Sequence, residues 1–277
     1  TLKLKASRVS TVKPPRVSIA LSVFDEDGRP FPSLESRNLM LIENGYICEE
    51  FEIKRVDNID ISLALLMDYS SSMSQENISH MEEAVTEFIS HVKPEDKVAV
   101  IKFASEIEIA RDLLPARGSA KASIKLGFKG DRNGTLLYDS VGEAVQMLGE
   151  EKGVKMIILL TDGDDSGSQR EADEVIQQAL GSGVIIHAIA LGEKANRKAL
   201  KKLAYSTGGE LHFTTDPQEL YSIYRDISQA LQCNYMITYS SPAYKRGLKE
   251  ISLIIGVEYG LLNADTSVNI GWGMDDG

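Results

Sequence analysis

The sequence has few of the residues that build redox centres and soft-metal sites. Its 277 residues include two cysteines and four histidines. The histidines share no ligand spacing along the chain, and neither cysteine has a Cys/His cluster near it; the histidines are His80, His91, His187 and His212. We therefore expect no Cys/His metal or redox motif, and we assign no role to His80 and His91.

Long apolar runs and common catalytic motifs are also missing. No apolar run approaches the ~18–20 residues that a helix needs to cross a bilayer, so we expect no direct membrane insertion of this chain. The sequence contains no Walker loop, no dinucleotide fingerprint and no Gly-x-Ser-x-Gly nucleophile turn. Nothing supplies a positioned base, a second-metal carboxylate set or a phosphate-binding cation cluster. We therefore predict that the chain is not an enzyme, and rank metal-assisted phosphoester hydrolysis low among the alternatives.

Two cysteines leave their own pairing open. Cys48 and Cys233 could form a single disulfide or remain two inert buried thiols, and we favour thiols slightly because no redox motif surrounds them. The first residue is Thr1 and no signal peptide is visible. We therefore expect a processed or truncated piece whose targeting segment, if it had one, has been removed.

Charge of one sign dominates the composition. Asp and Glu number 41 against 30 Lys and Arg, which gives a formal net charge of −11. Such a surface repels phosphate backbones, so nucleic acid is not an expected partner, whereas cationic partners or divalent ions fit the sign. With 43% hydrophobic and 26% charged residues the chain otherwise has the composition of an ordinary globular protein.

The middle of the chain alternates between apolar runs and helical patterns. The runs are nearly continuous and rich in Ile, Val and Leu, as is typical of strands covered on both faces; they are 61–67, 98–104, 154–160 and 184–191. Between and after them, apolar residues recur at three- and four-residue spacing; these predicted helices cover 76–92, a segment following Tyr138, a segment around 175–180, and 217–231. The alternation predicts an α/β fold with a doubly wound, mostly parallel sheet.

The two ends of the chain are β-rich. Residues 16–24 alternate at period two and precede a turn signal at 25–28, and no helical period competes in either end. Long single strands would be exposed edges, so we predict that the two ends pack together as a sheet or small sandwich. The predicted organisation is an N-terminal β-rich segment (1–57), a central domain (58–232) and a C-terminal β-rich segment (233–277).

Oxygen-bearing side chains follow the predicted strands at their carboxyl ends, where open α/β sheets bind ligands. Asp68, Ser70 and Ser72 come after the first run, Asp162 comes after the third, and a glycine-containing loop presents Thr135. The donors are carboxylates and hydroxyls, with no His or Cys, which suits a hard divalent cation: Mg²⁺ before Mn²⁺ or Ca²⁺. Alternate residues of a bent loop point the same way, so Asp-x-Ser-x-Ser can present three oxygens to one ion.

This set of motifs resembles the von Willebrand factor A (VWA) family. "DYSSS" (68–72), "GT" (134–135) and "TDGDD" (161–165) match the order and strand-end placement of that family's metal-ion-dependent adhesion site (MIDAS), over roughly residues 58–232. The ends of the chain resemble, more weakly, those of secreted bacterial proteins with this domain. The resemblance implies a Rossmann-like VWA fold and a location outside the cytoplasm, whether secreted, periplasmic or on the cell surface.

The resemblance also implies roles for individual residues. Ser70, Ser72 and Thr135 would bind Mg²⁺ directly, whereas Asp68 and Asp162 would act through ordered waters. One coordination position would remain for an acidic side chain of a protein partner, so the expected function is metal-dependent protein binding or adhesion. The alternative is a scaffold or assembly component of a cell-surface or envelope complex, in which the metal is mainly structural.

Several features also have a purely structural interpretation. Asp and Ser are good turn and helix-capping residues, so the loop at 69–73, which we call the serine loop, could simply end a strand. Asp164 and Asp165 could add a second ion, but we interpret them as solvated loop acids. "DEDG" (25–28) lacks the downstream acid of a calcium loop and is interpreted as a hairpin turn.

Overall fold

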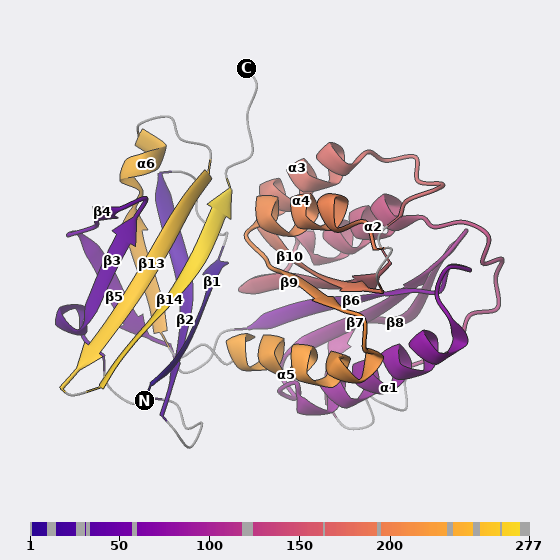
Figure 1. Ribbon diagram of the computed structural model, residues 1–277, viewed down its shortest axis with the longest axis horizontal. Helices are drawn as coiled ribbons and strands as arrows, with labels where there is room; N and C mark the ends of the chain where they lie inside the picture. Colours follow the sequence, from indigo (N-terminus) through magenta and orange to yellow (C-terminus); the bar gives the residue numbers. More distant parts are fainter. Residues whose placement is uncertain are drawn as a thin grey trace. The chain divides into compact units, whose positions relative to one another are not determined.

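The computed structural model describes most of the chain in two compact units. The described residues are 2–9, 15–25, 31, 34–56, 60–117, 124–162, 164–192, 195–231, 235–245, 250–260 and 262–271. Residues 60–228 form one unit, and residues 1–59 together with 229–277 form the other (Figure 1). We call these the central unit and the terminal unit. The predicted limits at 57/58 and 232/233 stay a prediction about where independently folding domains begin and end.

The described residues of the central unit form one six-stranded sheet. Its strands are β6 (Ile61–Asp68), β7 (Lys97–Phe103), β8 (Ile107–Pro115), β9 (Val154–Thr161), β10 (Val184–Leu191) and β11 (Leu211–Thr214). The order is β11-β10-β9-β6-β7-β8, and every neighbouring pair is parallel except β7 and β8. All residues of β6, β9 and β10 are buried, as their continuous apolar runs predict.

Helices cover both faces of this sheet. They are α1 (Gln75–His91), α2 (Leu137–Gly149), α3 (Ala172–Ser182), α4 (Arg197–Thr207) and α5 (Leu220–Leu231), the last preceded by a 3₁₀ turn at Pro217–Glu219. Figure 1 shows α2, α3 and α4 on one face and α1 and α5 on the other. The helical period of 76–92 places Met81, Val85 and Phe88 in the core, and Ser74 caps α1 by accepting a hydrogen bond from the Asn77 N–H. The predicted doubly wound α/β fold is therefore confirmed.

In the terminal unit, the part of the chain that the structure describes forms two four-stranded antiparallel sheets. Their strands are β1 (Lys3–Val9), β2 (Arg16–Phe24), β3 (Leu39–Glu43), β4 (Tyr46–Ile47), β5 (Phe51–Arg55), β12 (Tyr235–Ser240), β13 (Glu250–Tyr259) and β14 (Leu262–Gly271), with short helices η1 (Ser36–Asn38) and α6 (Pro242–Lys245). In one sheet β12 lies between β2 and β5, and in the other β13 lies between β14 and β3. Each sheet therefore pairs strands from both ends of the chain, which confirms that the β-rich ends pack together.

Local turn chemistry sets part of this unit. Asn44 and Gly45, with φ values of 48° and 84°, connect β3 to β4, as expected for the Asn-Gly turn of a tight hairpin. The predicted turn at 25–28 lies mostly outside the described residues. Cys48 is buried in the core of this unit, and burial together with the Glu43 carboxylate raises the pKa of its thiol to about 11. Cys233 lies outside the described residues, so the pairing of the two cysteines stays open.

None of the helices in the described residues is both long enough and apolar enough to span a bilayer.

Candidate metal-binding site

Asp68, the first predicted ligand, lies at the carboxyl end of β6, next to the carboxyl end of β9. β6 ends at Asp68, and β9, which pairs with it in parallel, ends at Thr161. The Asp68 carboxylate is completely buried; one oxygen accepts a hydrogen bond from the Thr161 hydroxyl at 2.6 Å and the other from the Ser70 N–H at 2.7 Å. The carboxylate is therefore held in one orientation at the edge of the sheet where ligands bind in such folds.

The serines that follow Asp68 turn their hydroxyls toward each other. The Oγ atoms of Ser70 and Ser72 are 2.9 Å apart, and Ser70 is buried whereas Ser72 is exposed. Two hydroxyl oxygens at this separation, beside a buried carboxylate, form a compact group of hard ligands on one loop. Ser70 and Ser72, two residues apart in the loop, thus turn their hydroxyls the same way.

Arg132, which was not predicted from the sequence, forms hydrogen bonds to the backbone of this loop. Its guanidinium donates hydrogen bonds to the backbone carbonyls of Tyr69, Ser70 and Met73, the last two at 2.9 and 2.8 Å. In return the Ser71 N–H donates to the Arg132 carbonyl at 2.7 Å. These bonds orient the loop through its backbone, and none of them uses a serine hydroxyl.

Thr135 lies between two other loops of the same edge. The Leu136 N–H donates to the carbonyl of Ala104, the residue after β7, at 2.8 Å. On its other side, the Thr135 N–H donates to the Ser166 hydroxyl at 3.0 Å and the Ser166 N–H to the Thr135 carbonyl at 3.1 Å. Thr135 is buried, at 6% exposure. The backbone of Thr135 and Leu136 is thus tied to the carboxyl end of β7 and to the loop after β9.

Asp162 follows β9 directly and completes the predicted set. It is half-buried, and its carbonyl accepts a hydrogen bond from the Asn196 N–H at 3.0 Å. Burial raises the pKa of the Asp68 carboxyl to about 6, the hydrogen bonds from Thr161 and Ser70 oppose this rise, and the negative charge of Asp162 adds to it. Two carboxylates and neutral hydroxyls at one edge make a donor set that a hard divalent cation fits, because the ion would offset the repulsion between the acids.

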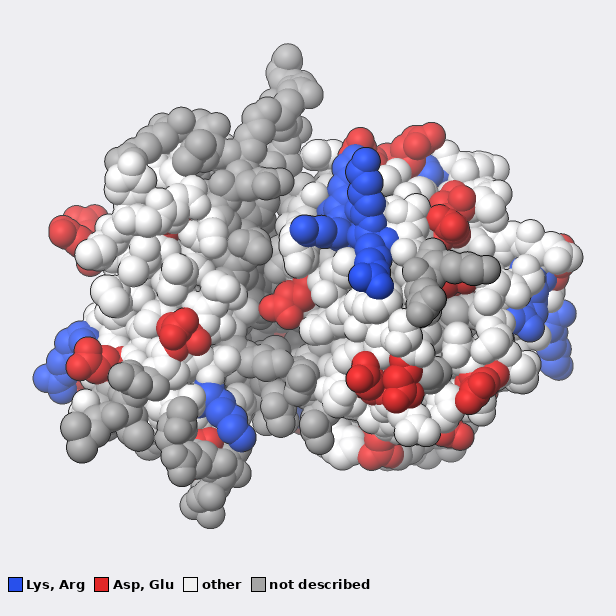
Figure 2. Space-filling model, in the orientation of Figure 1, with Lys and Arg blue, Asp and Glu red and all other residues white. Residues whose placement is uncertain are grey.

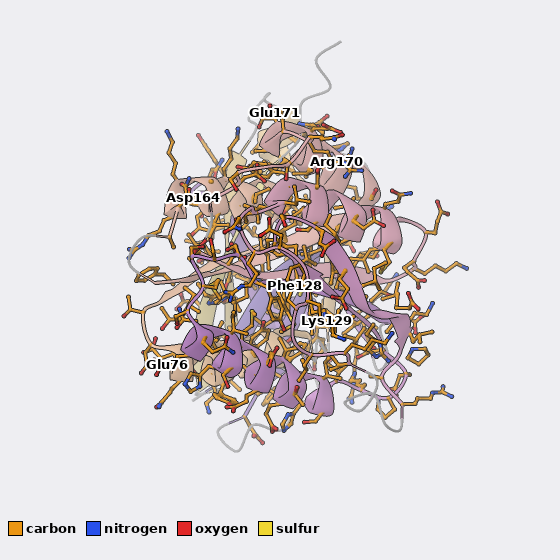
Figure 3. All side chains as sticks on the ribbon, turned by 90° about the vertical axis from the view of Figure 1, so that its right-hand side faces the viewer. Glu76, Phe128, Lys129, Asp164, Arg170 and Glu171 are labelled. Carbon is orange, nitrogen blue, oxygen red and sulfur yellow. The ribbon has the colours of Figure 1, made fainter. Side chains whose placement is uncertain are left out.

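The neighbouring acids have structural partners. The Asp165 carboxylate accepts hydrogen bonds from the Ser168 hydroxyl at 2.6 Å and from the Tyr138 N–H at 3.3 Å, in the first turn of α2. Asp164 accepts one from the Asn196 side-chain amide at 3.0 Å. These contacts support the interpretation of both residues as loop acids. Figure 3 faces this end of the central unit, with Asp164 and Phe128 labelled on two of its loops and Glu76 at the start of α1.

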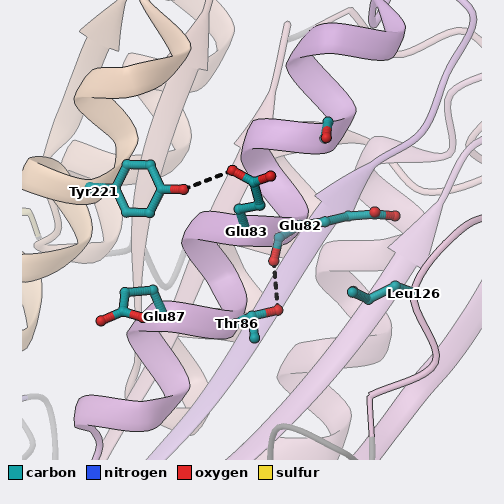
Figure 4. A pocket seen from close by; sticks show the side chains of 7 residues that line it. Glu82, Glu83, Thr86, Glu87, Leu126 and Tyr221 are labelled. Carbon is teal, nitrogen blue, oxygen red and sulfur yellow. Dashed lines mark hydrogen bonds between the residues drawn. The ribbon is translucent and has the colours of Figure 1, made fainter.

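A separate acidic groove runs along α1. It encloses about 490 Å³ and is lined by Glu82, Glu83, Glu87, Ser79 and Thr86 of α1, by Leu126 and by Tyr221 of α5 (Figure 4). The Tyr221 hydroxyl donates to Glu83 at 3.0 Å. Glu82 is already engaged, since it accepts hydrogen bonds from the Tyr69 hydroxyl at 2.6 Å and the Gly127 N–H at 2.8 Å. Glu82 thus fixes the side chain of Tyr69, the residue between Asp68 and Ser70.

Positive charge on the viewed face gathers over one helix. Figure 2 shows Lys and Arg side chains in a stripe over α4, whereas Asp and Glu side chains are scattered. The exposed cations of α4 are Arg197, Lys198, Lys201 and Lys202.

Several known proteins are similar to this chain in sequence. Inter-alpha-trypsin inhibitor heavy chain H4 of Homo sapiens is 27% identical over 221 residues, which cover 73% of this chain and 24% of that protein. Calcium-activated chloride channel regulator 4 of Homo sapiens is 29% identical over 161 residues, covering 56% and 17%. The chain thus spans about a quarter or less of the length of these curated relatives.

Solved structures show the same architecture. A von Willebrand factor type A protein from Catenulispora acidiphila superposes with a TM-score of 0.58 at 14% identity, over 99% of this chain and 74% of that one. Proximal thread matrix protein 1 from the mussel byssus gives a TM-score of 0.55 at 19% identity over 69% of this chain and 51% of that one, and another of its structures has a zinc-occupied MIDAS motif (69% and 49% covered).

The model of the von Willebrand factor type A domain matches residues 62–226, which is more than half of the chain. The motifs, the order of the strands and this match agree, and the chain belongs to the von Willebrand factor type A domain family.

Proposed function

We propose that the central unit is a metal-dependent protein-binding module. Ser70, Ser72 and Thr135 would bind a divalent cation directly, and Asp68 and Asp162 would bind it through water. The observation that carries the proposal is the pair of serine hydroxyls 2.9 Å apart beside the buried, doubly hydrogen-bonded Asp68 carboxylate. The all-oxygen donor set favours Mg²⁺, with Mn²⁺ or Ca²⁺ as alternatives.

The protein's own residues prepare the site for a partner. Arg132 orients the serine loop, Thr161 fixes the Asp68 carboxylate, and the bonds to Ala104 and Ser166 position the loop of Thr135. Hydroxyl and water ligands are neutral, so they would leave most of the positive charge of a bound cation uncompensated. An acidic side chain of a protein partner would then complete the coordination of the cation. The domain would perform this role outside the cytoplasm, in keeping with the resemblance of its ends to secreted bacterial proteins.

Metal binding is tested by calorimetric titration of chelator-treated protein with Mg²⁺ and Mn²⁺. We expect one binding site in the wild type and at least a tenfold weaker one in Thr135→Val, which keeps the side-chain shape but removes the hydroxyl. Thr86→Val is the matched control, because Thr86 lies on α1 and donates its hydroxyl to the Glu82 carbonyl. Equal affinities in wild type and Thr135→Val would contradict the ligand assignment.

Partner binding is tested with immobilised peptides that each carry one Glu, Asp, Gln or Asn. Retention only of the acidic peptides, lost in EDTA, would support coordination by a partner carboxylate. Retention that is unchanged in EDTA would instead favour the second candidate, a scaffold in which the metal is mainly structural.

A further inference from the structure

A second group of metal-ligand side chains lies at β10 and β11, the two strands at one edge of the central sheet. His187 of β10, His212 of β11 and Glu210, two residues before His212, place one ligand atom each within 4.8 Å of one another. The strands are adjacent and parallel, with Ile189 paired to His212. Side chains alternate along a strand, and Ala188, Leu211 and Phe213 pack with the core under α2, α3 and α4, so both histidines project to the opposite face.

The chemistry of this group differs from that of the serine loop. Two imidazoles and one carboxylate are ligands typical of Zn²⁺ and other borderline divalent transition metals, whereas Mg²⁺ prefers oxygen alone. His212 Nε2 and Glu210 Oε2 are 3.6 Å apart. Two ligands at about 2.0–2.1 Å from a tetrahedral zinc ion are roughly 3.3 Å apart, so the pair needs little movement to share an ion.

His187 gives the cluster its buried side, and Glu210 gives it an opening. His187 is 5% exposed, whereas the Glu210 side chain is 59% exposed and leaves a route for an ion from solvent. The two imidazole rings lie nearly parallel, with centroids 6.4 Å apart and planes inclined by 23°. Three protein ligands leave a fourth position for water or for a side chain of another molecule.

The hydrogen bond at His187 makes metal binding depend on the position of a proton. His187 Nδ1 accepts the Glu210 N–H at 3.3 Å, so the neutral ring carries its proton on Nε2. A metal bound at Nε2 requires that proton to move to Nδ1 or to leave, and a metal bound at Nδ1 replaces this long hydrogen bond. Either way, metal binding changes the state of the His187 ring, which can be observed directly.

We propose that His187, Glu210 and His212 form a binding site for Zn²⁺ or a similar borderline transition-metal ion, separate from the oxygen site at the serine loop. The histidines show no ligand spacing in the sequence because 24 residues lie between His187 and His212, and only the pairing of β10 with β11 brings them together. The local signal was Glu210-x-His212, because side chains two residues apart point the same way in extended backbone; β11 itself begins at Leu211, directly after Glu210.

The side-chain nitrogens of all four histidines can be followed by long-range ¹H–¹⁵N NMR on metal-free protein labelled at histidine. Zn²⁺ is added in the presence of excess Mg²⁺, which occupies the oxygen site. We expect the resonances of His187 and His212 to shift while those of His80 and His91 on α1 stay in place. The His187 tautomer changes if the metal binds Nε2 and is kept if it binds Nδ1. Shifts at none of the four, or equally at His80 and His91, would overturn the proposal.

Equilibrium dialysis with Zn²⁺ in excess Mg²⁺ measures the stoichiometry. We expect one Zn²⁺ per chain in the wild type, at least tenfold weaker binding in Glu210→Gln, and loss of binding in His212→Gln. His91→Gln is the matched control on an exposed helix position. Because His187 is buried, folding is checked by circular dichroism, and the partly exposed His212 and the exposed Glu210 carry the test.

An additional variant separates the two metal sites. Asp68→Asn should weaken Mg²⁺ binding but leave the Zn²⁺ stoichiometry in excess Mg²⁺ unchanged. Zn²⁺ binding that persists in His212→Gln and disappears in Asp68→Asn would assign the ion to the serine loop and overturn the proposal, whatever the fate of the proposed partner binding.

Discussion

Arg132 shows how a residue that need not touch the ion can shape a metal site. Its guanidinium donates hydrogen bonds to three backbone carbonyls of the serine loop, those of Tyr69, Ser70 and Met73. Hydrogen bonds to a charged donor are worth about 1.5–3 kcal/mol each, and here they act on backbone that has no secondary structure of its own. The geometry of the two serine hydroxyls therefore depends on a side chain from a different loop.

Replacing Arg132 should weaken metal binding without unfolding the central unit. In Arg132→Gln the loop loses most of its bonds to carbonyls, so we expect the affinity for Mn²⁺ to fall about tenfold, since a misplaced ligand costs of the order of 1–2 kcal/mol. Mn²⁺ titration and thermal unfolding are measured together. Arg37→Gln is the control, because Arg37 is exposed and pairs only at the surface with Glu35 in the described contacts. Wild-type affinity in Arg132→Gln would show that the loop holds its shape without the guanidinium.

Asp96 is a second residue whose environment has a measurable consequence, at the start of β7 rather than at the metal site. It is 4% exposed, and its carboxylate accepts a hydrogen bond from the Ile61 N–H at 3.2 Å. Burial raises the pKa of this carboxyl from 3.8 to about 6; the Ile61 N–H and Lys93 oppose the rise, and Glu95 and Asp60 add to it.

The sign of the pH effect follows from this raised pKa. The folded state holds the Asp96 proton more tightly than the unfolded state, so the contribution to stability is present below about pH 4 and is lost as pH rises to about 6. We expect Asp96→Asn, which keeps the acceptor for Ile61, to equal wild type near pH 4 and to exceed it at pH 7 by up to about 3 kcal/mol. Urea unfolding across this range measures it, with the exposed Asp112→Asn as control. A stability difference that does not change with pH would contradict the prediction.

At the scale of elements, the sequence predicts the buried centre of the fold better than its edges. β6, β9 and β10 are continuous apolar runs because both of their faces are covered, and this signal depends on no distant residue. β8, β11 and α4 were not predicted from the sequence. β8 lies at the sheet edge and carries charges among its apolar residues, β11 has only four residues, and α4 buries a narrow stripe among Lys and Arg.

The predicted site divides in the same way. Asp68, Ser70, Ser72 and Asp162 follow strands that the sequence identifies, so their common edge could be predicted. The support from Arg132 and the His187–His212 cluster could not, because each joins segments whose proximity only the folded sheet determines. Local sequence reports burial and turns, whereas contacts between loops depend on tertiary packing.

Glu43 illustrates the same limit in the terminal unit. It is the last residue of β3, yet it is 1% exposed and accepts hydrogen bonds from the Tyr239 hydroxyl (2.7 Å), the Ser241 hydroxyl (2.9 Å) and the Ala243 N–H (2.7 Å). These partners are about 200 residues away in sequence. A buried carboxylate with three donors connects β3 of one sheet to the segment that ends β12 of the other.

At the scale of the whole molecule, the two units differ in how they depend on chain continuity. The central unit is one uninterrupted segment with its own core, whereas each sheet of the terminal unit combines strands from both ends of the chain. Removing residues 233–277 would take β12 from between β2 and β5 and β13 from beside β3. The remaining N-terminal strands would have unpaired edges, which exposes them to aggregation.

This difference predicts opposite outcomes for two fragments. Residues 58–232 should fold cooperatively and bind Mn²⁺ with wild-type affinity, because every residue in the proposed oxygen site, together with Arg132 and Thr161, lies within that segment. Residues 1–57 alone should show no cooperative unfolding, because β2 and β3 lose partners that only the C-terminal segment supplies. Calorimetric unfolding and metal titration of both fragments measure this, with Asp68→Asn in the 58–232 fragment as the binding control. A 58–232 fragment that is folded but binds metal weakly would mean that the terminal unit contributes to the site, since the metal ligands themselves would all still be present.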